Sequence, residues 1–236
     1  MTAINIIVKA DCAHVFTDGA FYSSAGILTH VGQKCFTLPT MDSALVIRGR
    51  CDVMPLLINE IDKRCSDFDS VVEEVASALQ AVTTMAAVVM PEVLHAGAFD
   101  PAFELWLIGY STSRRAFETY ILPTHDYHAG LIAWQVGKVE GSICAPAPTA
   151  DAARAAGLTE QVGLDAFDPA VDGLKLLEIQ RLVPSAFDMR HPAKVGCIVG
   201  GLAQLTTITR EGIFTKVLKR WPDRVGQRIG IAAVSV

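Results

Sequence analysis

The chain carries little charge. Only 19% of its 236 residues are Asp, Glu, Lys or Arg, against 51% that are hydrophobic, which is too apolar for a disordered tail or linker. It has no run of Lys or Arg and a formal net charge of -5, so it lacks the basic surface that binds nucleic acid or an anionic membrane. We expect a compact fold. We also expect a homo-oligomer, because the exterior of a monomer normally carries more charge.

Long hydrophobic runs are also missing. The longest apolar stretch, residues 76–94, is broken by Gln80, by two threonines, and by Pro91 and Glu92. It therefore falls short of the roughly 20 predominantly apolar residues of a membrane span, and we interpret it as a buried helix. Residues 1–11 lack the basic and apolar regions of a signal peptide, so we expect a cytoplasmic protein without a membrane partner.

The six cysteines include no C-x-x-C pair, which argues against a zinc ribbon and a disulfide framework. The close pairs of metal-ligating residue types are Cys12 with His14 and His125 with His128. Two ligands do not define a zinc site, so we expect no bound metal. The glycines of residues 196–201 lack the Lys-Ser/Thr of a phosphate loop, and we expect no nucleotide there. No cofactor is therefore expected.

The hydrophobic pattern predicts one α+β domain over residues 1–236, with helices outside two packed sheets. Alternation and turn signals predict strands over residues 4–9, 14–16, 25–30, 34–38, 45–48, 103–110, 115–122, 131–136, 195–199, 204–209 and 212–217. Helical spacing predicts helices over residues 52–64, from residue 66 or 67 to about Pro91, and over residues 151–156 and 169–182.

Three polar residues in the first part of the chain suggest a catalytic site. Removal of the initiator Met would leave Thr2 with a free amine beside its own hydroxyl, and such an amine, with an ordinary pKa of about 7.7–8.0, can accept the hydroxyl proton. A nearby lysine would lower the pKa of the hydroxyl, provided that a carboxylate orients and balances it. Asp18 lies 16 residues after Thr2, and Lys34 lies 32 residues after it.

At these residues the sequence resembles the proteasome β-subunit branch of the N-terminal nucleophile (Ntn) hydrolases, whose threonine, aspartate and lysine have the same spacing. The resemblance implies a four-layer αββα sandwich that assembles into rings. It implies that Thr2 is nucleophile and base, that Lys34 tunes it, and that Asp18 holds Lys34. Residues 200–212, with a glycine pair before a strand and an acidic-glycine turn after it, look like the final hairpin of the family.

The resemblance also implies an oxyanion hole and a substrate pocket. Gly49, displaced by about one residue from the family's position, is the candidate whose N–H binds the oxyanion. Ile47 is the candidate that shapes the pocket, and an aliphatic residue there favours an apolar substrate side chain. The sequence departs from the family at residues 194–201, which contain neither the supporting aspartate nor the serine that precede the glycine pair. A retained Met1 would block the amine.

Several interpretations stay open. The first is a threonine-type peptidase that hydrolyses peptides or unfolded proteins inside a ring. The second is a non-catalytic proteasome-like structural or assembly protein, of the kind carried by bacteria or prophages, and the third is an Ntn amidase for small amides. In the plainest alternative, Thr2 merely starts a strand, Asp18 caps a turn and Lys34 is a solvated hairpin residue. Cys35, next to Lys34, is a weaker candidate nucleophile because it points to the opposite face of its strand.

Overall fold

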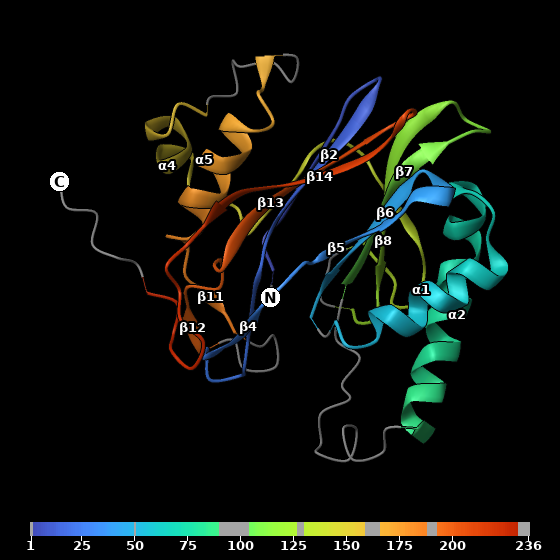
Figure 1. The fold of residues 1–236 in the computed structure, drawn as a ribbon, viewed down its shortest axis with the longest axis horizontal. Coiled ribbons are helices and arrows are strands. Elements are labelled where there is room, and N and C mark those ends of the chain that lie inside the picture. Colours follow the sequence, from blue (N-terminus) through green and yellow to red (C-terminus); the bar gives the residue numbers. More distant parts are fainter. Residues whose placement is uncertain are drawn as a thin grey trace. The chain divides into compact units, whose positions relative to one another are not determined.

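The computed structural model describes residues 2–49, 51–89, 104–126, 130–158, 166–187 and 193–230 (Figure 1). The chain forms two compact units. The first unit comprises Met1–Cys35, Gly141–Thr207 and Phe214–Val236, and the second comprises Phe36–Glu140 and Ile208–Ile213. Each unit is therefore assembled from segments that lie far apart in the sequence.

The fold is mixed, with several sheets and few helices. The strands are β1 (Ile4–Val8), β2 (Cys12–Asp18), β3 (Ala20–Tyr22), β4 (Leu28–Val31), β5 (Cys35–Leu38), β6 (Ser43–Arg48), β7 (Glu104–Ser111), β8 (Ala116–Pro123), β9 (Gly137–Val139), β10 (Ile143–Ala145), β11 (Ser185–Ala186), β12 (Val195–Gly196), β13 (Leu202–Thr209) and β14 (Gly212–Arg220). The helices are the 3-10 turn Pro39–Met41, α1 (Met54–Arg64), α2 (Phe68–Val89), α4 (Ala150–Ala155) and α5 (Val171–Gln180).

The first unit is built on a sheet with the strand order β10-β1-β2-β13-β14. Helix α5 packs against β2, and α4 lies next to α5 (Figure 1). The contact with β2 is close, because a Cβ atom at Gly173 would lie 2.1 Å from the ring of Phe16. Phe16 belongs to an apolar core with Leu177, Val199 and Trp221. The chain thus places the N-terminal strands beside its last strands.

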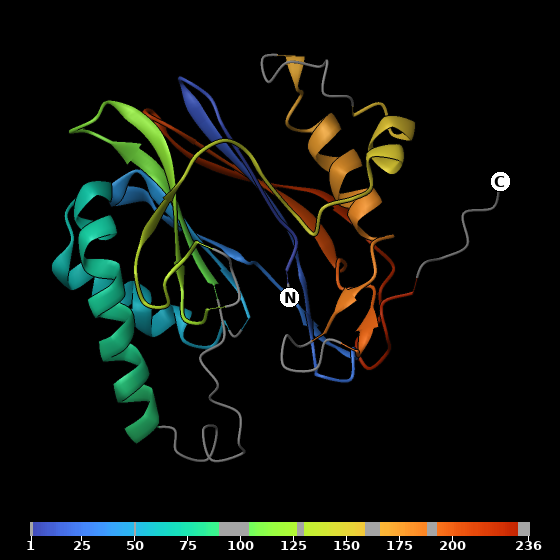
Figure 2. The same ribbon diagram turned by 180° about the vertical axis from the view of Figure 1, so that it is seen from behind.

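The second unit has the strand order β5-β6-β7-β8-β9, with antiparallel pairing from β6 to β9. Helices α1 and α2 pack against each other, and α2 contacts β7 (Figure 2). The predicted spacing of α2 is confirmed, since Val71, Val75, Leu79 and Val82 are fully buried in the core of this unit. Among the described helices, none is long and apolar enough to span a bilayer.

The structure corrects the strand predicted over residues 131–136. This stretch forms turns and irregular backbone, and strand β9 begins only at Gly137. Trp134 has a φ of 64°, a left-handed conformation that bulky residues rarely adopt and that no strand contains. Its N–H donates to the carbonyl of Pro123 at 2.7 Å, so the chain bends back at this point.

Two other strand predictions need smaller corrections. The segment 25–30 is not one strand: residues 24 and 25 form a turn, Ile27 makes an isolated bridge with Arg228, and strand β4 begins at Leu28. The segment 195–199 is extended only over Val195–Gly196, which pairs with Ser185–Ala186. Pro91, the predicted end of the second helix, lies outside the described residues.

Candidate active site

The structure brings the three predicted catalytic residues together in the first unit. Thr2 comes just before β1, Asp18 ends β2, and Lys34 comes directly before β5. All three side chains are buried: Thr2 is 3% exposed, Asp18 is inaccessible and Lys34 is 2% exposed. Lys34 is therefore not a solvated hairpin residue, and that part of the plainest alternative is wrong.

Asp18 is the centre of this cluster, because its carboxylate accepts four hydrogen bonds. Oδ1 accepts from Nζ of Lys34 at 2.8 Å and from the N–H of Ala3 at 3.0 Å. Oδ2 accepts from the N–H groups of Ala20 at 3.0 Å and of Gly200 at 3.1 Å. An ionised carboxylate has about four acceptor positions, so the anion is fully bonded here. Asp18 holds the lysine and also closes the turn to β3.

The shared oxygen sets how far the lysine lies from the start of the chain. The Ala3 nitrogen and the Lys34 ammonium each lie within 3.0 Å of Oδ1. These two nitrogens are consequently within about 6 Å of each other. The residue directly after Thr2 and the predicted tuning cation are thus fixed by one atom.

An aromatic pair lies beside the lysine, and the sequence analysis missed it. The Lys34 ammonium is 5.2 Å from the centre of the Phe21 ring. The ring of His30, on β4, stacks on Phe21 with centroids 4.1 Å apart and planes 7° from parallel. A ring face attracts a cation, so Phe21 and Asp18 both stabilise the charged lysine. Strand β3, which carries Phe21, is three residues long and gave no hydrophobic pattern to detect.

Gly49 and Ile47 belong to the second unit. Gly49 follows β6 with a φ of 118°, a conformation that glycine adopts without strain. Ile47 is 1% exposed and packs in the apolar core with Leu45 and Leu57. The oxyanion role of Gly49 stays a prediction. The pocket role of Ile47 also stays a prediction. In the structure the Ile47 side chain packs in the apolar core.

The cysteines near the site are poor nucleophiles. Burial raises the pKa of Cys35 to about 12, so its thiol stays protonated at neutral pH. Burial and the neighbouring Asp11 raise the pKa of Cys12 to about 11. The Sγ of Cys12 lies 3.3 Å from Nε2 of His14, and Nδ1 of that ring lies 3.1 Å from the hydroxyl of Thr207. These contacts give the Cys12 thiol and the His14 ring partners within the chain.

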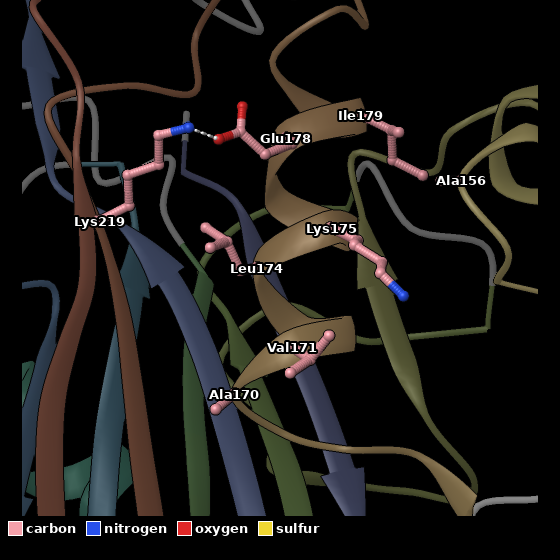
Figure 3. A pocket seen from close by; sticks show the side chains of 8 residues that line it. All are labelled: Ala156, Ala170, Val171, Leu174, Lys175, Glu178, Ile179 and Lys219. Carbon is pink, nitrogen blue, oxygen red and sulfur yellow. Dashed lines mark hydrogen bonds and ion pairs between the residues drawn. The ribbon is translucent and has the colours of Figure 1, made fainter.

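The described part of the chain contains no group of three or more His, Cys, Asp or Glu side chains that could hold a metal ion. His128, one of the histidines considered above, lies outside that part. A groove of about 530 Å³ runs along α5 (Figure 3). Its walls include Val171, Leu174 and Ile179, and Glu178 pairs with Lys219 at its edge. None of the predicted catalytic or substrate-binding residues lines this groove.

No protein-family model matches the sequence, and no curated protein matches it. Among solved structures, the fold is similar to that of a Gly-1 mutant of Anbu from Hyphomicrobium sp. strain MC1, with a TM-score of 0.55. The match covers 94% of this chain and 89% of that chain at 8% identity. Anbu is a bacterial proteasome-like Ntn hydrolase family member. The likeness bears on the fold alone, and at that level it agrees with the resemblance found from Thr2, Asp18 and Lys34.

Proposed function

We propose that the protein is a threonine-type peptidase that hydrolyses peptide bonds with a processed N-terminal Thr2. The observation that carries this proposal is the buried contact between Lys34 and Asp18 at 2.8 Å, with the amide that follows Thr2 on the same carboxylate oxygen. We propose further that residues 1–236 form a single αββα domain and that the domain works in a homo-oligomer.

The proposed reaction is acyl transfer to the threonine. The Thr2 Oγ attacks the substrate carbonyl carbon, and the Thr2 amine takes the hydroxyl proton and passes it to the leaving amine. The charge on Lys34 lowers the pKa of the hydroxyl and disfavours protonation of the neighbouring amine. The N–H of Gly49 is assigned to the developing oxyanion. A water molecule then attacks the acyl-enzyme with the amine as its base and releases the second product.

The buried salt bridge to Asp18 holds the Lys34 ammonium in one position during the proposed reaction. Lysine is almost never fully buried unless it is paired, and a rigid cation stabilises charge without reorganising during the reaction. Asp18 is fully bonded and thereby unsuited to be the general base. The Thr2 amine is therefore the natural base, and its exposure requires removal of Met1.

The direct test is the intact mass of the protein from its native host after incubation with a peptide epoxyketone. This probe forms its stable ring adduct only with a free threonine amine and its hydroxyl. We expect a chain without Met1 that carries one adduct. The Thr2→Ala variant is the matched control, because its small second residue still permits Met1 removal but offers no hydroxyl. A chain that retains Met1 and forms no adduct would overturn the proposal.

A second candidate is a non-catalytic proteasome-like assembly protein. The absence of an aspartate or serine in residues 194–201 favours it, since the family carries these supporting residues before its glycine pair. Such a protein would assemble and yet react with no epoxyketone. An adduct together with hydrolysis of small amides, but of no peptide, would instead identify an amidase.

A further inference from the structure

We propose that the ion pair between Arg181 and Asp223 positions the catalytic carboxylate by fixing the glycine turn that donates to Asp18. The inference rests on the proposed function, because it assigns a positioning role in the proposed site to Arg181 and Asp223. In the described contacts, these two residues touch neither Thr2 nor Lys34. All of the residues involved belong to the first unit.

The pair is buried and rigid. Arg181 follows α5 directly, and Asp223 lies just after β14. Their side chains are 10% and 3% exposed, and two parallel contacts join them: Nη1 to Oδ2 at 2.8 Å and Nη2 to Oδ1 at 3.0 Å. The guanidinium also lies 4.5 Å from the ring of Trp221. A two-contact pair with a stacked guanidinium has one preferred orientation, so it can hold neighbouring groups in place.

What the pair holds is the backbone on both sides of Gly200. Nη1 of Arg181 donates to the carbonyl of Val199 at 3.0 Å. Oδ2 of Asp223 accepts from the N–H of Gly201 at 2.7 Å. The Arg181 cation therefore holds the carbonyl group before Gly200, and the Asp223 anion holds the N–H group after it.

Gly200 in turn connects this ion pair to the catalytic cluster. Its N–H donates to Oδ2 of Asp18 at 3.1 Å, and its carbonyl accepts from the N–H of Gly19 at 3.0 Å. A Cβ atom at Gly200 would lie 2.7 Å from Oδ2 of Asp223, so any other residue there would displace this carboxylate. Two consecutive amides thus donate to two different carboxylates, the first to Asp18 and the second to Asp223.

The consequence concerns the orientation of Asp18. A carboxylate that loses one of its donors turns toward the donors that remain, and Lys34 is bound to the other oxygen of the same group. Displacement of the glycine turn would therefore change the position of the ammonium as well. Arg181 and Asp223 supply charged support from segments distant in sequence, where residues 194–201 have no acidic or hydroxyl side chain. They are positioning residues.

The experiment compares the variants Asp223→Asn and Arg181→Lys with the native chain by hydrogen–deuterium exchange of the peptide 196–202. We expect Asp223→Asn to speed exchange of the Gly200 and Gly201 amides by about tenfold or more, the effect of losing one buried hydrogen bond. Glu118→Gln is the control, because it weakens the ion pairs of a buried carboxylate with the half-exposed Arg114 and Lys138 in the second unit and leaves the glycine turn untouched. Native protection of this peptide in Asp223→Asn would overturn the proposal.

A second readout separates positioning from plain stability. The rate of epoxyketone adduct formation is measured against pH, and we expect Asp223→Asn to shift the midpoint of that profile. Arg181→Lys keeps the charge, so it should retain the native midpoint. If Asp223→Asn fails to fold, native protection of the peptide 196–202 in Arg181→Lys would overturn the proposal. A lower rate with an unchanged midpoint in Asp223→Asn would overturn the positioning role. If the native chain forms no adduct, the proposed function fails, and the exchange data alone decide whether the pair holds the turn.

Discussion

Lys34 and Asp18 carry opposite charges in a place that water barely reaches, with side chains 2% and 0% exposed. Taking two ions out of water costs free energy, which such a pair regains only with good geometry and with its other atoms hydrogen-bonded. Asp18 meets that condition with three backbone N–H donors besides the lysine. The pair is consequently costly to break, whatever its part in catalysis.

Replacing Lys34 by alanine should therefore affect both activity and stability. We expect Lys34→Ala to form no epoxyketone adduct and to lower the free energy of unfolding by about 3–5 kcal/mol, the cost of an unpaired buried charge. Urea denaturation measures the stability. Lys175→Ala is the control, because Lys175 is half-exposed and pairs with Asp172 within one helix, so its loss should cost less than about 1 kcal/mol. Equal stability of the two variants would contradict the prediction.

His14 predicts a pH dependence of stability. Burial lowers the pKa of His14 below its ordinary value of 6.5, and the nearby Lys9 lowers it further, against the opposing effect of Asp11. The unfolded chain then binds more protons than the folded chain, so this contribution to stability is complete above pH 6.5 and is lost as the pH falls below it. We expect His14→Gln to lose less free energy of unfolding than the native chain between pH 7.5 and pH 5.5. An identical loss in both would exclude the explanation.

At the scale of whole elements, α5 depends on a glycine in its first turn. Alanine is favoured over glycine in a helix by about 1 kcal/mol, yet a Cβ atom at Gly173 would overlap the buried ring of Phe16. We expect Gly173→Ala to destabilise the protein by about 1–3 kcal/mol because the core is overpacked. Thermal or urea unfolding measures the change. The double variant Gly173→Ala with Phe16→Leu should regain part of it, and no recovery would speak against the overlap as the cause.

Local hydrophobic spacing was enough to predict most helices and the longer strands. The helices α1 and α2 depend on apolar residues three and four positions apart, and a pattern of that kind is visible without knowledge of distant contacts. The segment 131–136 shows the limit. Its apolar residues suggest a strand, but Trp134 takes a left-handed conformation and donates its N–H to the distant carbonyl of Pro123. Strands of two or three residues carry too little pattern to detect.

The candidate site was predictable in part. The spacing of Thr2, Asp18 and Lys34 suggested a cluster because it matches the spacing of the threonine, aspartate and lysine in the proteasome β-subunit family that the sequence resembles. The donor Gly200 is 182 residues from Asp18 in the chain, and no local feature links the two. The pair between Arg181 and Asp223 is equally non-local. Side chains that support a site from a distance become visible only in the folded structure.

At the scale of the whole molecule, the fold is similar to that of Anbu although only 8% of the aligned residues are identical. Different sequences can fill one architecture when the apolar pattern and the turns are kept, whereas the chemistry depends on a few residues. The likeness therefore says little about activity by itself. The three polar residues of the first unit must carry that argument.

The composition predicts association of the chains. Charged residues are few, and large apolar side chains are exposed on the described surface, among them Phe214 at 62%, Val225 at 63% and Ile132 at 60%. We expect sedimentation velocity to give a mass that is a multiple of the 25.3 kDa of one chain and that is stable to dilution. A single species of one chain at every concentration would refute the prediction.

The position of β2 next to β13 has a consequence for how the protein is made. The ribosome synthesises Asp18 early, whereas the Gly200 amide that completes its hydrogen bonds is added 182 residues later, which at about 5–20 residues per second means a delay of roughly 10–40 s. During that delay the first strands lack their neighbour in the sheet. An aminopeptidase can therefore act on the nascent chain before β13 pairs with β2 and before Gly200 donates the last hydrogen bond to Asp18.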